Sequence, residues 1–133
     1  MRTLLVGVLV LLAACDPAAI AHFDVRPRPG RNIDSSFVLE ATRVGRDFAQ
    51  RYQLVSRESR DCPGGAYYSA DTARGRPVGL TLCLGRTRSG FRFRVSEIIT
   101  FSWGPKGTAL RDELADTLRS LYGDGVEASI SRH

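Results

Sequence analysis

Two runs of alternating residues limit most strongly what this chain can fold into. Residues 78–85 place an apolar side chain at every second position, and residues 91–103 repeat the pattern with larger side chains. Successive side chains of a strand point to opposite faces, so each run predicts a strand with one buried face. The segment 85–90 begins and ends with glycine and predicts the hairpin loop between the two strands.

The second run is longer than a usual strand, and its alternation breaks at Glu97 and Ile98. Both features predict a β-bulge or bend at these two residues. A buried Glu97 carboxylate would be a candidate general acid. A Glu97 that turns to solvent, or that pairs with an arginine, would have a structural role instead.

Helical spacing occurs on both sides of this hairpin. Asp34, Ser35 and Ser36 predict the start of a helix, because all three are good N-cap residues. Its apolar face comprises Phe37, Ala41, Val44, Phe48 and Tyr52. Thr108 predicts the start of a second helix, whose apolar stripe is Leu110, Leu114, Leu118 and Leu121, and Gly123 and Gly125 predict its end.

Two shorter strands complete the predicted fold, at residues 67–70 and 126–131. The predicted order is therefore α-β-β-β-α-β. This order indicates an α+β fold with a small antiparallel-rich sheet and both helices packed on one face.

The N-terminus carries a different signal. Arg2 precedes an unbroken run of apolar or small residues from Leu4 to Ala14. A membrane-spanning helix needs roughly 20 apolar residues, so this shorter run predicts a signal peptide. Read alone, it is also compatible with an ordinary secretory signal followed by an unmodified cysteine.

The segment Leu12-Ala13-Ala14-Cys15 resembles the lipobox of bacterial lipoproteins. The resemblance implies that Cys15 receives a diacylglyceryl group on sulfur, that the signal peptide is cut before it, and that its new amine is acylated. It therefore implies a membrane anchor on the periplasmic side. Asp16 resembles the inner-membrane retention signal of enterobacterial lipoproteins, which favours the inner membrane over the outer one.

These signals divide the chain into three parts. Residues 1–14 are the expected signal peptide, residues 15–33 a lipidated cysteine with a Pro/Arg-rich tether, and residues 34–133 a single globular domain. The tether is expected because its prolines disfavour a helix.

The number of cysteines is consistent with an exported protein on the periplasmic side of the membrane. If Cys15 carries lipid, Cys62 and Cys83 remain as one disulfide pair in an oxidising space. The alternative is a reactive Cys62, which requires a neighbour that activates the thiolate.

Motifs for catalysis or metal binding are not found. His22 falls in the expected tether and His133 is the final residue, so neither supports a triad or a zinc site. We expect no cofactor and no metal. The net charge is +5, but without a dense Lys/Arg block we expect no nucleic-acid partner.

Arginines gather around the predicted hairpin, at Arg86, Arg88, Arg92 and Arg94. Guanidinium groups suit carboxylates and phosphates, so these four are candidate residues for binding an acidic protein or an anionic envelope component. The alternative is a solvated edge that keeps the hairpin soluble.

The sequence favours a non-catalytic binding module anchored in the membrane: an inhibitor, an immunity-type protein or an accessory subunit of an envelope complex. The alternative is a small envelope hydrolase that acts on glycan through carboxylates including Glu97.

Overall fold

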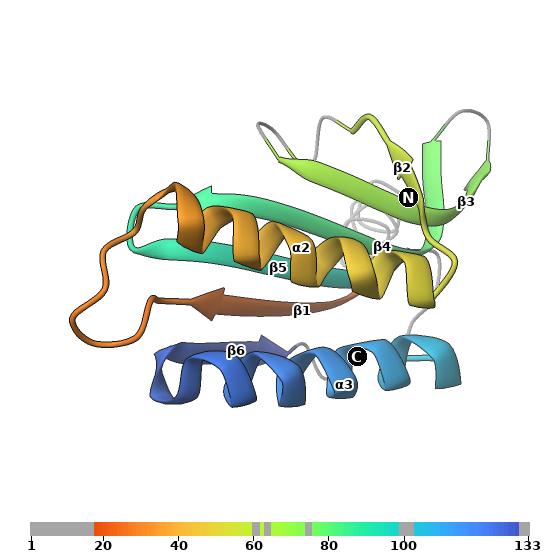
Figure 1. The fold of residues 1–133 in the computed structure, drawn as a ribbon. Coiled ribbons are helices and arrows are strands. Elements are labelled where there is room, and N and C mark those ends of the chain that lie inside the picture. The colour runs from red at the N-terminus through yellow and green to blue at the C-terminus, as the bar shows by residue number, and fades with distance from the viewer. Residues whose placement is uncertain (1–17, 60–61, 63–64, 74–75, 99–102, 131–133) are drawn as a thin grey trace, which may run out of the picture.

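Six antiparallel strands form one sheet, and both helices pack on the same face of it (Figure 1). The computed structural model describes residues 18–59, 62, 65–73, 76–98 and 103–130. The strands are β1 (Ala18–Val25), β2 (Val55–Arg57), β3 (Ala66–Ala73), β4 (Arg76–Thr87), β5 (Gly90–Ile98) and β6 (Val126–Ile130). The helices are α2 (Ser35–Arg51) and α3 (Pro105–Tyr122), and the 3₁₀ turn η1 (Gly123–Gly125) follows α3. The predicted α+β class is confirmed.

Strand β1 is the main departure from the predicted order. The sheet order is β2-β3-β4-β5-β1-β6, so β1 lies between β5 and β6 and pairs antiparallel with both. Its side chains at Ala19, Ala21, Phe23 and Val25 are buried. The prediction that residues 15–33 form a tether is therefore wrong over 18–25. The prolines that suggested it are Pro17, Pro27 and Pro29, and none of them falls within residues 18–25, where a proline would interrupt the strand.

Strands β4 and β5 form the predicted hairpin, with a tighter turn than expected. Their register is continuous from the Gly79–Ile98 pair to the Thr87–Gly90 pair, which leaves only Arg88 and Ser89 in the turn. The expected bulge at Glu97-Ile98 is not present, because both residues pair regularly with β1 and β4. Strand β5 ends at Ile98, and residues 99–102 lie outside the described residues.

The two helices bury the apolar faces that their spacing predicts. In α2 the side chains of Phe37, Ala41 and Phe48 are buried, whereas Val44 and Tyr52 are half-buried. In α3 the leucines 110, 114 and 118 are completely buried, and Leu121 is half-buried. These residues pack on Phe23, Leu82, Leu84 and Phe93 of the central strands, which are also fully or almost fully buried. Within the described residues, neither helix is long and apolar enough to cross a bilayer.

Helix α2 begins as its sequence predicts, and α3 does not. Asp34 caps α2, accepting a hydrogen bond of 2.9 Å from the backbone N–H of Phe37. Helix α3 starts at Pro105 rather than at Thr108, and its N-cap residue Gly104 has no side chain to act as a cap.

The carboxylate of Glu97 serves as the cap of α3. Its Oε1 accepts a hydrogen bond of 2.8 Å from the backbone N–H of Gly104. It also places a negative charge at the positive end of the helix dipole. Gly107 leaves the space for it, because a Cβ on this residue would lie 1.7 Å from the same oxygen.

The predicted disulfide between Cys62 and Cys83 is present, with a sequence separation of 21 residues. Cys83 alternates with the buried leucines of β4, so the bond lies on the sheet face opposite the helices. It fastens Cys62, in the connection between β2 and β3, to a central strand.

We expect replacement of both Cys62 and Cys83 by alanine to lower the free energy of unfolding by about 3 kcal/mol, because the closed loop restricts the unfolded chain. Urea denaturation of the wild type and the double variant measures the difference. A reductant should lower the wild-type stability by a similar amount and leave the double variant unchanged. Equal stability of the oxidised wild type and the double variant would contradict the prediction.

We expect Gly107→Ala to lower the free energy of unfolding by about 1 kcal/mol, because the new Cβ displaces the Glu97 carboxylate and the loss of its charged hydrogen bond exceeds the gain in helix propensity. In a Glu97→Ala background the same substitution should be neutral or stabilising. Denaturation of the four proteins in this double-mutant cycle measures the coupling. A Gly107→Ala effect that is the same in both backgrounds would refute the role given to Glu97.

Candidate functional site

The four arginines singled out by the sequence do not form one surface. Arg92 and Arg94 alternate with the buried residues of β5 and therefore lie on the sheet face opposite the helices. Arg86 shares the parity of Leu84 and lies at the helix side of the sheet. Arg88 belongs to the tight turn between β4 and β5.

Arg92 is already paired within the fold. Its Nε and Nη2 donate hydrogen bonds of 2.7 and 3.1 Å to the two carboxylate oxygens of Asp24 on β1. The hydrogen bond to Asp24 raises the pKa of Arg92. Asp24 falls in the segment predicted to be a tether, so its pairing with Arg92 was not expected from the sequence.

His22 lies beside this ion pair on the same face of β1. Burial lowers the pKa of His22, and the positive charges of Arg92 and Arg94 lower it further, against the opposing effect of Asp24. The imidazole is therefore mostly neutral near pH 7. On this helix-free face the charge of Arg92 is therefore offset by Asp24, and the neighbouring imidazole adds little positive charge.

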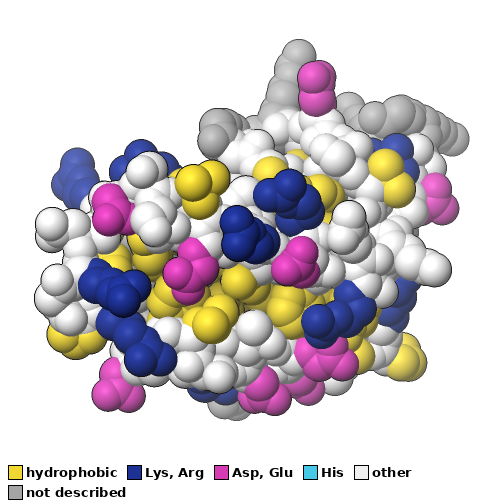
Figure 2. Space-filling view, in the orientation of Figure 1, with side chains coloured by type: hydrophobic (Ala, Val, Ile, Leu, Met, Phe, Trp, Pro, Cys, Tyr) yellow, Lys and Arg dark blue, Asp and Glu magenta, His cyan; other side chains and the backbone are white. Residues whose placement is uncertain are grey.

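Five arginines gather instead at one end of the sheet, which we call the arginine end: Arg26, Arg28, Arg31, Arg86 and Arg88. The first three follow β1, Arg86 lies near the end of β4, and Arg88 lies in the β4–β5 turn. Val25 pairs with Phe91, and a Cβ on Gly90 would lie 1.9 Å from the carbonyl oxygen of Val25, so the two segments are in contact. Lys and Arg side chains are prominent at this end of the molecule, at the left in Figure 2.

A tight turn fixes two of these arginines relative to each other. The backbone N–H of Arg31 donates a hydrogen bond of 3.0 Å to the carbonyl of Arg28. Pro29 occupies the second position, and Gly30 occupies the third with a φ of 85°. This is the arrangement of a type II turn, in which proline presets the first central residue and glycine accepts the positive φ of the second.

Arg28 fastens this turn to the end of α3. Its Nε donates to the carbonyl of Leu121 at 2.7 Å, and its Nη2 donates to the carbonyl of Ser120 at 3.2 Å. The last carbonyls of a helix lack partners within the helix, and a cation there also complements the helix dipole. Arg28 is therefore a structural residue that positions the loop.

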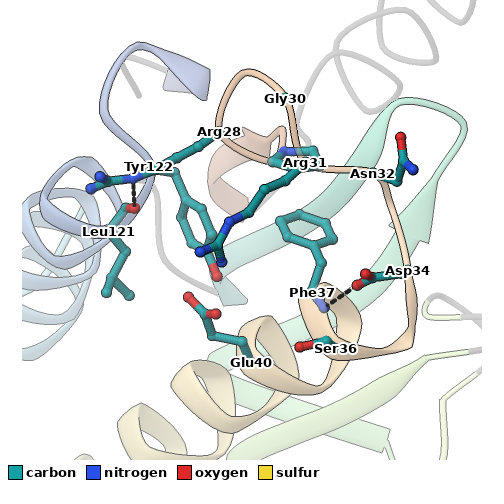
Figure 3. Close-up of a pocket in the computed structure, with 11 residues that line it drawn as sticks. Arg28, Gly30, Arg31, Asn32, Asp34, Ser36, Phe37, Glu40, Leu121 and Tyr122 are labelled. Atoms are coloured by element: carbon teal, nitrogen blue, oxygen red, sulfur yellow. Dashed lines mark hydrogen bonds between the residues drawn. The ribbon is translucent and has the colours of Figure 1, made fainter.

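A pocket of about 630 Å³ opens between this loop, the start of α2 and the end of α3 (Figure 3). Phe37 and Tyr122 contribute rings whose centroids are 5.7 Å apart in an edge-to-face contact. The side chain of Arg31 extends into the pocket toward Tyr122, and the carboxylate of Glu40 points toward it from α2. Within the described residues, the guanidinium of Arg31 makes no hydrogen bond or ion pair.

The hydroxyl of Tyr122 is the most unusual polar group of this pocket. Tyr122 is 95% buried, since only 5% of its surface is exposed. The buried hydroxyl forms no hydrogen bond of normal geometry within the described part of the chain. Burial raises the pKa of Tyr122, and the carboxylate of Glu40 raises it further, both by its charge and by a weak hydrogen-bonding interaction with the hydroxyl. The phenol therefore keeps its proton at neutral pH and remains able to donate it in a hydrogen bond.

Two residues that the sequence suggested for chemistry are engaged within the fold. The carboxylate of Glu97 is engaged by the start of α3, and Cys62 is part of a disulfide. In the described residues, no group of three or more His, Cys, Asp and Glu side chains could hold a metal ion. Cys15, the expected lipidation site, and His133 lie outside the described residues.

The pocket was not expected from the sequence, because residues 15–33 were predicted to hold the lipidated cysteine and a tether. One signal was available: a Pro-Gly pair is typical of the centre of a type II turn, and here an arginine stands on each side of it. The contributions of Glu40 and Tyr122 could not have been found, because only the packing of α2 beside α3 brings them together.

Comparisons of this chain with protein-family models, with curated proteins and with solved structures find no match. The function is therefore inferred from the pocket and the arginine end themselves.

Proposed function

We propose that this protein is a lipid-anchored, non-catalytic binding module of the bacterial cell envelope. Its lipid would be attached at Cys15, and the arginine end with its pocket would receive an anionic group of a partner. An inhibitor, an immunity-type protein and an accessory subunit of an envelope complex are the classes that fit such a module. Asp16 favours the inner membrane.

The direction of β1 supports this proposal. Ala18 follows Cys15 by three residues, so the first residue of β1 lies within about 10 Å of the anchoring cysteine, even along a fully extended chain. The strand then covers about 23 Å, at roughly 3.3 Å per residue, before the loop that carries Arg26, Arg28 and Arg31. An anchor at Cys15 would thus hold one end of the sheet at the membrane and turn the arginine end away from it.

The single observation that carries the proposed binding role is the pocket with Arg31 at its mouth. Volumes of about 300–1,000 Å³ are typical of ligand pockets, and the volume of this one is within that range. The side chain of Arg28 is held by two backbone carbonyls, whereas the guanidinium of Arg31 extends over Phe37 and Tyr122 and makes no hydrogen bond or ion pair among the described residues. A guanidinium in that position favours a carboxylate or another anion.

We expect the mature protein to begin at a Cys15 that carries lipid, because small residues precede the cysteine at the end of a short apolar run. Mass spectrometry of the purified membrane protein measures the mass of its N-terminal peptide. Cys15→Ser should abolish the lipid mass and release the protein from membranes or leave it unprocessed. A mature chain with an unmodified N-terminus at another position would contradict the anchor.

We expect Arg31→Gln to reduce the amount of partner recovered by cross-linking and affinity capture from membranes. Arg46→Gln is the matched control, because Arg46 is also exposed but lies on α2 outside the pocket. The Arg46 variant should recover partners as the wild type does, and added salt should weaken the wild-type interaction. Equal recovery by the wild type and the Arg31 variant at low salt would refute the binding role of the pocket.

A further inference from the structure

Two opposite charges face the same pocket and restrict what it can bind. Arg31 supplies a positive charge near the ring of Tyr122, and Glu40 supplies a negative charge from the next element (Figure 3). The other two charged residues of the lining are already engaged: Arg28 by the end of α3, and Asp34 by the N–H of Phe37. The pocket therefore presents one cation and one anion to a ligand.

A simple anion fits this arrangement poorly. Phosphate or an isolated carboxylate would gain the hydrogen bonds of Arg31, but it would also be placed beside the carboxylate of Glu40. Like charges at short range in a partly desolvated site repel each other. A ligand that also presents a hydrogen-bond donor to Glu40 offsets this repulsion with a favourable contact.

The hydroxyl of Tyr122 adds a second requirement. The hydroxyl lies beside the Glu40 carboxylate but makes no hydrogen bond of normal geometry with it, so a ligand oxygen that accepts from this hydroxyl would give it a well-formed hydrogen bond. The same acceptor can receive the guanidinium of Arg31, since both side chains point into one space. One carboxylate, with two oxygens, can accept from both groups.

We infer that the pocket binds a carboxylate with an N–H donor on the adjacent carbon, which is the chemistry of an α-amino acid. In this arrangement Arg31 and Tyr122 bind the carboxylate, Glu40 accepts from the nitrogen, and the ligand side chain packs against Phe37 and Leu121. A free amino acid and the C-terminal residue of a peptide share this chemistry. The inference rests on the proposed binding role and specifies the ligand class of the same site.

Four related probes separate the parts of this recognition: phenylalanine, 3-phenylpropanoate, phenylalanine amide and N-acetylphenylalanine. The second lacks the nitrogen, the third lacks the carboxylate, and the fourth has the amide N–H and carboxylate of a peptide C-terminus. Isothermal titration calorimetry with the purified full-length protein in detergent measures each affinity, and inorganic phosphate is tested in the same way.

We expect phenylalanine or N-acetylphenylalanine to bind at least about tenfold more tightly than 3-phenylpropanoate, and the amide and phosphate to bind more weakly still. Tighter binding of phenylalanine identifies a free amino acid as the ligand, and tighter binding of N-acetylphenylalanine identifies a peptide C-terminus. Either order supports the inference.

Three variants assign the contacts, and a fourth, Arg46→Gln, is the control. Arg31→Gln should weaken the preferred probe by about tenfold, Tyr122→Phe by several-fold, and Arg46→Gln not at all. Glu40→Gln should bring the affinities of phenylalanine and 3-phenylpropanoate close together, a change that a general loss of structure would not produce. Two-dimensional NMR spectra of each variant check that the fold is retained.

The inference is overturned if none of the probes binds, or if 3-phenylpropanoate or phosphate binds as tightly as the amino-acid probes. In the second case, dependence of that binding on Arg31 would keep the proposed anion-binding role while refuting the ligand class. The capture experiment with Arg31→Gln tests the binding role separately, so the two failures can be distinguished.

Discussion

The two-sided pairing of β1 is the interaction on which the rest of the fold depends. Strand β6 pairs with β1, and β1 in turn joins it to β5. Without β1, the backbone groups of two strands would lose their partners and α3 would lose part of the surface it covers. The small side chains of Ala19 and Ala21, both fully buried, allow the sheet and this helix to pack closely there.

Helix α3 is held at both ends by charges that come from other elements. Glu97 of β5 binds its first turn, and Arg28 of the loop after β1 binds its last carbonyls. Each charge has the sign that complements the helix dipole at its end. These contacts also place the pocket, because the loop that Arg28 fastens to α3 is the one that directs Arg31 toward Tyr122.

The elements that were predicted correctly have their sequence signals within the element itself. The alternation of leucines gave β4, the cap Asp34 gave the start of α2, and the leucine stripe gave the buried face of α3. The features that were not predicted are one strand and two contacts between elements. Strand β1 also alternates, but the prolines before and after it in the sequence suggested a tether instead. The cap supplied by Glu97 and the meeting of Glu40 with Tyr122 depend on contacts between elements distant in the sequence, which no local pattern records.

The continuity of β1 with the loop that carries Arg31 has a mechanical consequence. For a protein anchored at Cys15, tension between the membrane and a ligand held at Arg31 would run along the covalent backbone of one strand. The hydrogen-bonded ladders on either side would brace that strand without having to transmit the full load. A partner could then be pulled relative to the membrane with little tendency to peel the sheet apart, so the attachment would resist force better than the modest size of the domain suggests.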